Sequence, residues 1–138
     1  MDSILIDTDV CIDFLAARKP WNDEAIQLFE ASEEGTVDTC ISALTYSDLF
    51  YILRKDNGAP TTISILSDLR KISDVIPVSI QTVDWALSCK WKDFEDALQY
   101  QSAVEAGCNA VVTKNLHDYR MATPLPVYSP AKFISTYL

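Results

Sequence analysis

Two acidic residues near the start of the chain follow a short apolar run, so they stand at the end of a predicted strand. Residues 4–6 read Ile-Leu-Ile and lead at once into Asp7-Thr8-Asp9. In an open α/β sheet, catalytic and ligand-binding groups collect just beyond the carboxyl ends of the strands. Asp7 is therefore a candidate site residue, with Thr8 and Asp9 in support. The alternative is that Asp7 only caps the helix that follows it.

Two further acids lie in predicted helices. Asp48 has apolar side chains four residues before it and three and four residues after it, so we expect it to face inward. Asp96 begins a predicted helix whose later small residues would let it lie close to a sheet, which would carry Asp96 to a strand's carboxyl edge. Capping is the alternative for both, because Thr45-x-x-Asp48 resembles a capping box and Asp93 with Asp96 resembles an N-cap and an acid at N3.

The fourth candidate segment follows another apolar strand pattern. Residues 110–113 read Ala-Val-Val-Thr and lead into Lys114 and Asn115, with Asp118 three residues further on. The side-chain oxygens of Thr113 and Asn115 suit Mg²⁺ or Mn²⁺ better than Zn²⁺. Ordinary turn chemistry is the alternative for this loop.

Together these segments predict a cluster of carboxylates that holds divalent cations. Its members would be Asp7, Asp48, Asp96 and either Asn115 or Asp118. Clustered carboxylates repel one another and burial raises their pKa values, so a divalent cation would relieve the strain. Cations held there could activate water for attack on a phosphodiester and stabilise the charge that develops.

The apolar periodicity of the chain alternates between strand and helix patterns. Pro77 places the third predicted strand near a sheet edge. The alternation predicts a three-layer α/β/α sandwich with a mostly parallel central sheet, in a single domain over residues 1–138. Strands are predicted at 36–41, 75–78, 110–113 and near 127–128 besides 4–6, helices at 10–18, 22–34, 44–56, 61–72, 81–90, 93–107 and from 130 onward, and a loop at 115–119.

The charge balance limits how the protein could meet nucleic acid. The net charge is −9, with 20 acidic and 11 basic residues. Tight, sequence-independent binding through phosphate neutralisation is therefore not expected, whereas an enzyme that meets its substrate through bound cations is compatible with this charge. The basic doublets at 18–19, 54–55 and 70–71 fall near predicted helix ends, where the macrodipole favours cations.

Composition also bears on the compartment. No apolar run is long enough to span a bilayer and no signal peptide is visible, so we expect a cytoplasmic protein without a membrane partner. The four cysteines are far apart among apolar neighbours and are expected to be buried, reduced thiols. His117 lacks the Cys or second His of a zinc site, so we expect a solvated loop residue.

The order and surroundings of the acids resemble the PIN-domain nucleases over nearly the whole chain. The matching segments are residues 4–10, 41–49, 93–107 and 111–115. The resemblance implies a divalent-metal-dependent endoribonuclease that hydrolyses RNA, and for a small domain it implies a VapC-like toxin, usually a homodimer, with a cognate antitoxin protein. Carried over by position, the metal-site acids are Asp7, Asp48 and Asp96, and the fourth position falls on Asn115 or Asp118.

The chain departs from the family pattern at three positions. The second acid is commonly Glu, and Asp48 is one methylene shorter. The residue two after the first acid is commonly Asn, and here it is Asp9. Asn115 is neutral at the fourth position, so either Asp118 substitutes for it or a second cation binds weakly.

Two other functions stay open at this point. The opening Asp7-Thr8-Asp9-Val10 also matches haloacid dehalogenase-like phosphatases, in which Asp7 would be the nucleophile, although no later acidic pair follows a strand. A PIN-like module that binds without catalysis is the second alternative. Aromatic residues could serve a protein interface, but for Phe50 and Tyr51 we expect a place in the core.

Overall fold

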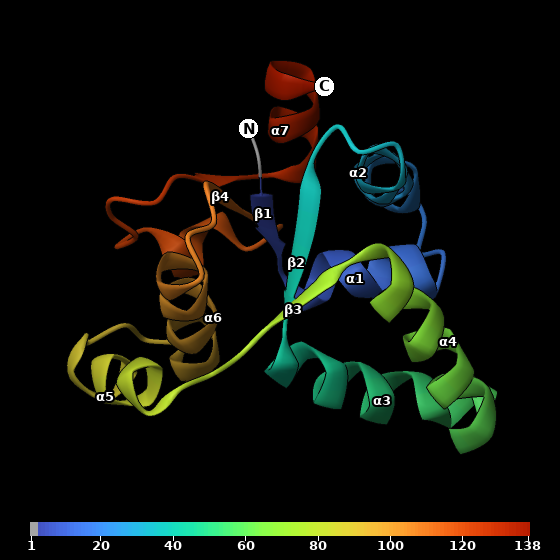
Figure 1. Ribbon diagram of the computed structural model, residues 1–138, viewed down its shortest axis with the longest axis horizontal. Helices are drawn as coiled ribbons and strands as arrows, with labels where there is room; N and C mark the ends of the chain where they lie inside the picture. Colours follow the sequence, from blue (N-terminus) through green and yellow to red (C-terminus); the bar gives the residue numbers. More distant parts are fainter. Residues whose placement is uncertain (1–2) are drawn as a thin grey trace.

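The computed structural model describes residues 3–138 and shows a five-stranded sheet between two layers of helices (Figure 1). All four strand pairings in this part of the chain are parallel, in the order β3-β2-β1-β4-β5. The predicted three-layer α/β/α sandwich is thereby confirmed, with a sheet that is parallel throughout. The strands are β1 (Ser3–Ile6), β2 (Asp38–Ser42), β3 (Asp74–Ile76), β4 (Ala110–Val112) and β5 (Val127–Tyr128).

The helices follow the predicted pattern with two differences. The first helix ends at Leu15 rather than near residue 18, because Ala17 adopts a positive φ of 50° that interrupts helical geometry. Residues Leu116–Tyr119, predicted as a loop, form a short 3₁₀ helix, η1. The α-helices are α1 (Thr8–Leu15), α2 (Asn22–Glu33), α3 (Ala43–Asn57), α4 (Ala59–Ile72), α5 (Ile80–Ser88), α6 (Phe94–Glu105) and α7 (Pro130–Tyr137).

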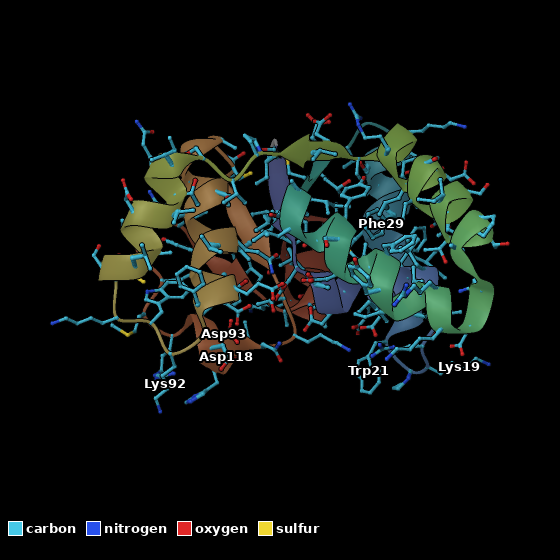
Figure 2. All side chains as sticks on the ribbon, turned by 90° about the horizontal axis from the view of Figure 1, so that it is seen from below. Lys19, Trp21, Phe29, Lys92, Asp93 and Asp118 are labelled. Atoms are coloured by element: carbon cyan, nitrogen blue, oxygen red, sulfur yellow. The ribbon has the colours of Figure 1, made fainter. Side chains whose placement is uncertain are left out.

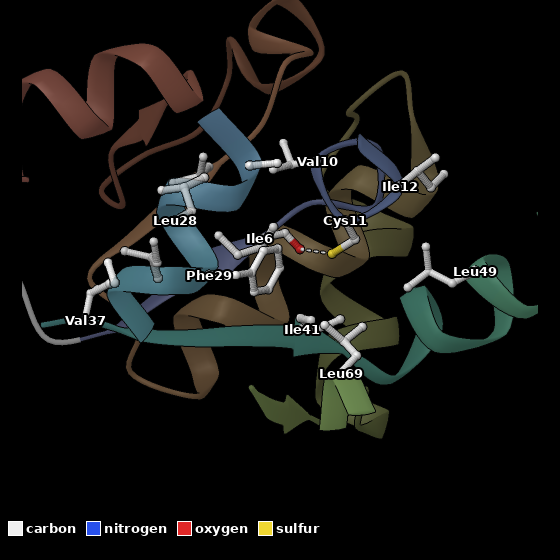
Figure 3. Close-up of a cluster of buried hydrophobic side chains, with 14 of the residues drawn as sticks. Ile6, Val10, Cys11, Ile12, Leu28, Phe29, Val37, Ile41, Leu49 and Leu69 are labelled. Carbon is white, nitrogen blue, oxygen red and sulfur yellow. Dashed lines mark hydrogen bonds between the residues drawn. The ribbon is translucent and has the colours of Figure 1, made fainter. Parts of the chain in front are cut away.

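Strand β1 lies at the centre of the sheet, and its side chains alternate between two apolar layers. Ile4 and Ile6 pack with residues of α1 to α4 and α7, in the cluster that Figure 3 shows in part. Leu5 points to the opposite face and packs with Tyr100 and Ala103 of α6. Both faces of β1 are therefore buried, as a central parallel strand requires.

The sheet topology creates a crevice beside β1. From β1 the chain proceeds to β2 and β3 on one side, whereas β4 and β5 lie on the other side. Crevices at such reversals, outside the carboxyl ends of the strands, are the usual ligand sites of open α/β sheets. The backbone N–H of Asp7 donates to the carbonyl of Val112 at 3.0 Å, which ties the ends of β1 and β4 together at this point.

Other sequence-based expectations concern the strand edge, the thiols and the membrane. Strand β3 is an edge strand, as Pro77 predicted, and it ends just before that proline. The four cysteines are free thiols, three of them buried and Cys89 half-buried. Within residues 3–138, no helix combines the length and the apolar character needed to cross a bilayer.

Candidate active site

A cleft of about 460 Å³ opens at the carboxyl edge of the sheet. Three helices contribute to it: α1 follows β1, α3 follows β2, and α6 brings its N-terminal turn to the same place. The cleft combines many carboxyl groups with a few apolar side chains. Its lining residues are Asp7, Thr8, Asp9, Ile12, Asp48, Tyr51, Ile52, Asp93, Glu95, Asp96, Gln99 and Asn115.

Asp7 is both the N-cap of α1 and the most firmly held acid of the cleft. Its Oδ1 accepts from the backbone N–H of Thr8 at 2.7 Å and from Nε2 of Gln99 at 2.9 Å. Its Oδ2 accepts from Oγ1 of Thr113 at 2.7 Å and from the hydroxyl of Tyr119 at 3.4 Å. Burial nevertheless raises the pKa of Asp7, because hydrogen bonds from neutral groups do not fully replace lost hydration.

Asp96 lies at N3 of α6, and the N-cap of this helix is Asp93. Oδ1 of Asp93 accepts from the backbone N–H of Asp96 at 2.9 Å, so the predicted N-cap is Asp93. The Asp96 side chain is buried, and burial together with the charge of Asp7 raises the pKa of Asp96 to about 7. Its Oδ1 also accepts from the hydroxyl of Tyr119 at 3.5 Å, so Tyr119 lies between Asp7 and Asp96.

Asp9 carries an oxygen without a partner. Burial and the charge of Asp7 raise the pKa of Asp9 to about 7, although the Lys114 charge and a 3.2 Å hydrogen bond from its backbone N–H oppose the rise. Within the described residues, Oδ1 of Asp9 is buried and receives no hydrogen bond. Such an oxygen is costly unless something binds it.

Asp48 faces the cleft from the first turns of α3. The capping alternative for it is wrong, because Ser42 is the N-cap of α3 and Thr45 instead shares a 2.9 Å hydrogen bond with Thr8 across to α1. Asp48 makes a hydrogen bond with Glu95, and this bond, followed by burial, raises the pKa of Glu95 to about 8. Two carboxyl groups can share such a bond only when one carries a proton.

The two candidates for the fourth metal-site position, Asn115 and Asp118, lie in different parts of the site. Asn115 lines the cleft, and its backbone N–H donates to Oγ1 of Thr113 at 3.0 Å. Asp118 instead contributes an oxygen to a group with Asp93 and Asp96 whose ligand atoms lie within 4.8 Å of one another. Figure 2 shows Asp93 and Asp118 close together near the start of α6. Which of the two fills the position in the presence of a cation stays a prediction.

Three site residues were missed by sequence reasoning. Glu95 lies next to Asp96, and its extra methylene carries its carboxyl group across to the shorter Asp48. Gln99 lies three residues after Asp96 on the same face of α6, a spacing that could have indicated it. Tyr119 gave no signal, since its approach to Asp7 depends on η1.

One expectation about the cleft wall is wrong. Tyr51 was expected in the core, but it is 56% exposed and lines the cleft. The core stripe of α3 is instead Thr45, Leu49 and Leu53, spaced four residues apart. Phe50 is half-buried and packs against the larger apolar cluster, as expected.

The residues of the cleft fit a hard divalent cation. Every candidate ligand atom is an oxygen, which Mg²⁺ and Mn²⁺ prefer. The raised pKa values of Asp9 and Asp96 and the unpartnered Oδ1 of Asp9 indicate carboxyl groups whose negative charge is not fully compensated. In residues 3–138 the two ion pairs are Lys71 with Asp68 and Lys114 with Asp13, both outside this group.

Comparison with known structures finds the same fold in toxin–antitoxin complexes. A toxin–antitoxin complex from Klebsiella pneumoniae is 23% identical, with a TM-score of 0.70 over 92% of this chain and 97% of that chain. A DNA-bound VapBC from Salmonella typhimurium is 19% identical, with a TM-score of 0.70 over 94% and 99%. VapC20 from Mycobacterium tuberculosis, described as a Sarcin-Ricin loop cleaving toxin, is 14% identical, with a TM-score of 0.62 over 78% and 86%.

A comparison with models of known protein families shows which family the chain belongs to. A search of curated proteins finds no match. The family model of the PIN domain matches residues 3–117, which covers β1 to β4 and all the candidate acids except Asp118. The haloacid dehalogenase-like alternative is thereby set aside. The chain belongs to the PIN-domain family.

Proposed function

We propose that this PIN domain is a divalent-metal-dependent endoribonuclease that hydrolyses RNA phosphodiester bonds. The observation that carries the proposal is the convergence of buried Asp7 and Asp96 and half-buried Asp9, all with raised pKa values, in an open cleft. Among residues 3–138, none of these three carboxyl groups forms an ion pair with a lysine or arginine. Groups with perturbed pKa values in a cleft are candidates for chemistry. The acids Asp7, Asp48, Asp96 and Asp118 would hold Mg²⁺ or Mn²⁺.

The bound cation would supply Lewis acidity that activates water and stabilises negative charge on phosphate oxygens. The chain itself fixes the ligands. Gln99, Thr113 and Tyr119 hold both oxygens of Asp7, so this carboxylate cannot swing away from the cleft. Glu95, whose pKa is about 8, can take up or release a proton near neutral pH. His117 is exposed in η1, as expected, and pairs with Arg120.

We further propose that the protein is the toxin of a toxin–antitoxin pair. Support comes from the fold, which it shares with proteins found in complexes described as VapBC or toxin–antitoxin. A cognate antitoxin protein is the corresponding partner. The homodimer implied by the family resemblance stays a prediction.

Cleavage of RNA with and without a chelator tests the proposal. We expect the purified protein to cut RNA with Mg²⁺ or Mn²⁺, to stop when EDTA is added, and to lose activity on the order of 100-fold with Asp96→Asn. Asp84→Asn is the matched control, because Asp84 is exposed on α5 outside the cleft. Expression of the wild-type chain should also arrest bacterial growth, whereas Asp96→Asn should not.

Two results would count against this function. Metal-dependent RNA cleavage by Asp96→Asn at the wild-type rate would contradict the proposed mechanism. A wild-type protein that neither cuts RNA nor binds Mn²⁺ would instead be a PIN-like binding module without catalysis.

A further inference from the structure

One wall of the acidic cleft is apolar and aromatic. Asp48, Tyr51 and Ile52 are spaced i, i+3 and i+4 on α3, and all three line the cleft. Tyr51 is 56% exposed and Ile52 39% exposed. The ring of Tyr51 is thus exposed in the cleft one helical turn from Asp48, where a ligand of the cleft can contact it.

A cation lies against this ring. The guanidinium carbon of Arg54 is 4.8 Å from the ring centroid of Tyr51 and 6.0 Å from that of Phe50. The two rings meet edge to face, with centroids 5.5 Å apart, which supports the orientation of Tyr51. Among the described residues, Arg54 makes no ion pair with a carboxylate, so its charge remains available.

A second cation near the cleft, Lys114, is already paired. Nζ of Lys114 lies 2.6 Å from the buried carboxylate of Asp13 and 4.0 Å from the ring centroid of Trp21. With a net charge of −9, the chain offers few cations to the phosphate backbone of RNA, and among the described residues Arg54 is one that stays unpaired beside this wall. Contacts to a base become correspondingly more important for holding the substrate.

We propose that Tyr51 and Arg54 form a nucleotide subsite for single-stranded RNA, in which a base stacks on the Tyr51 ring and Arg54 binds an adjacent phosphate. This proposal rests on the proposed ribonuclease function of the same cleft. Unpaired bases stack on aromatic side chains and on guanidinium planes, whereas bases within a duplex are already stacked and unavailable. Along α3 the order is Asp48, then Tyr51, then Arg54, so a strand leaving the acids meets the ring first and the guanidinium next.

The subsite also predicts selectivity. Stacking tolerates any base, so Tyr51 should favour unpaired RNA over duplex RNA without specifying a sequence. Arg54 should contribute a salt-dependent part of the binding, because it would displace a counterion from the phosphate. These two contributions can be measured separately.

Binding of a short single-stranded RNA that contains 2-aminopurine tests the subsite. Anisotropy gives the affinity, and quenching of 2-aminopurine fluorescence reports stacking. We expect Tyr51→Leu to weaken binding about tenfold and to abolish quenching, and Tyr51→Trp to preserve both. Tyr137→Leu is the control, since Tyr137 is a 41% exposed aromatic residue on α7 outside the cleft. Arg54→Gln should weaken binding and lower the slope of its salt dependence by about one ion.

An abasic substrate identifies the contact. Replacing the stacked nucleotide by an abasic site should weaken binding to the wild type about tenfold and leave Tyr51→Leu unaffected. In cleavage assays Tyr51→Leu should raise KM and leave kcat nearly unchanged. Melting temperatures of the variants check that the fold is intact.

The outcomes separate this inference from the ribonuclease proposal. Unchanged affinity and quenching in Tyr51→Leu, with RNA still cut by the wild type, would overturn the subsite and leave the nuclease standing. Tyr51-dependent stacking by a protein that does not cut RNA would support the subsite and overturn the nuclease. Wild-type RNA affinity in Tyr51→Leu, together with loss of binding to a protein partner, would assign this wall to protein recognition and overturn the inference.

Discussion

Two buried aspartates belong to the region of α1, Asp7 as its N-cap and Asp13 in its last turn, and they are stabilised in opposite ways. Asp13 is 1% exposed, and its Oδ2 lies 2.6 Å from Nζ of Lys114. Asp7 is 3% exposed and receives hydrogen bonds only from neutral groups, while Asp9 and Asp96 add negative charge nearby. Burial therefore does not distinguish Asp7 from Asp13. The difference is that Asp13 has a counter-charge in Lys114, whereas Asp7 forms no ion pair among the described residues.

Lys114 contacts both Asp9 of the cleft and the buried Asp13. Its backbone N–H donates to Oδ2 of Asp9, and its side chain reaches Asp13, one helical turn further along α1. The same ammonium lies over the ring of Trp21, which is labelled in Figure 2. Lys114 therefore fastens the end of β4 to α1, and its ammonium pairs with Asp13 rather than with an acid of the cleft.

Removing the internal cation should have the largest effect on stability. Lys114→Met leaves the buried Asp13 carboxylate without its partner, and we expect a loss of about 3 kcal/mol in the free energy of unfolding, measured by urea denaturation. The double variant Asp13→Leu/Lys114→Met should recover most of that loss, because it removes the buried charge as well. A single Lys114→Met variant as stable as the wild type would abolish the contrast between Asp13 and Asp7.

The acids of the cleft should make the metal-free protein less stable as the pH rises. Asp9 and Asp96 have folded-state pKa values of about 7, above the ordinary aspartate pKa of 3.8, so the folded state binds protons more tightly than the unfolded state between these values. The melting temperature in EDTA should therefore fall from about pH 4 to about pH 7 through these groups, and Mg²⁺ should reduce the fall at its upper end.

The variant Asp96→Asn tests this expectation further, because it removes one of the negative charges that repel one another in the cleft. Its melting temperature in EDTA should equal or exceed that of the wild type near pH 8 and should depend less on pH. A large loss of stability in this variant would mean that Asp96 acts structurally, although the cap itself is supplied by Asp93. A melting temperature as steeply pH-dependent as that of the wild type would contradict the repulsion argument.

The sequence carried enough information to predict the sheet, its helices and the approach of three acids. Asp7 follows a strand, and Asp48 shares a face with Tyr51 and Ile52, so periodicity and strand ends were sufficient for both. Periodicity also indicates which residues share a helix face, but not whether that face meets the core or an open cleft. The exposure of Tyr51 was missed for this reason.

The site contacts that were not predicted depend on how the helices and strands pack against one another. Local sequence patterns do not encode these distances. Tyr119 reaches Asp7 across 112 residues of sequence, and Lys114, just after β4, reaches Asp13 in the helix that follows the neighbouring strand β1. Glu95 gains its role only because Asp48 lies opposite it. Such pairings follow from packing, which sets the spacing of α1, α3 and α6 around the cleft.

Calorimetric titration of Mg²⁺ and Mn²⁺ into the chelator-treated protein near pH 7.5 tests the central claim most directly. The wild type and Asp84→Asn should bind the cation with equal affinity and release protons, because protonated carboxyl groups must ionise to become ligands. Asp7→Asn should bind far more weakly. Absence of binding to the wild type, or unchanged affinity in Asp7→Asn, would contradict the account of the cleft as a cation site.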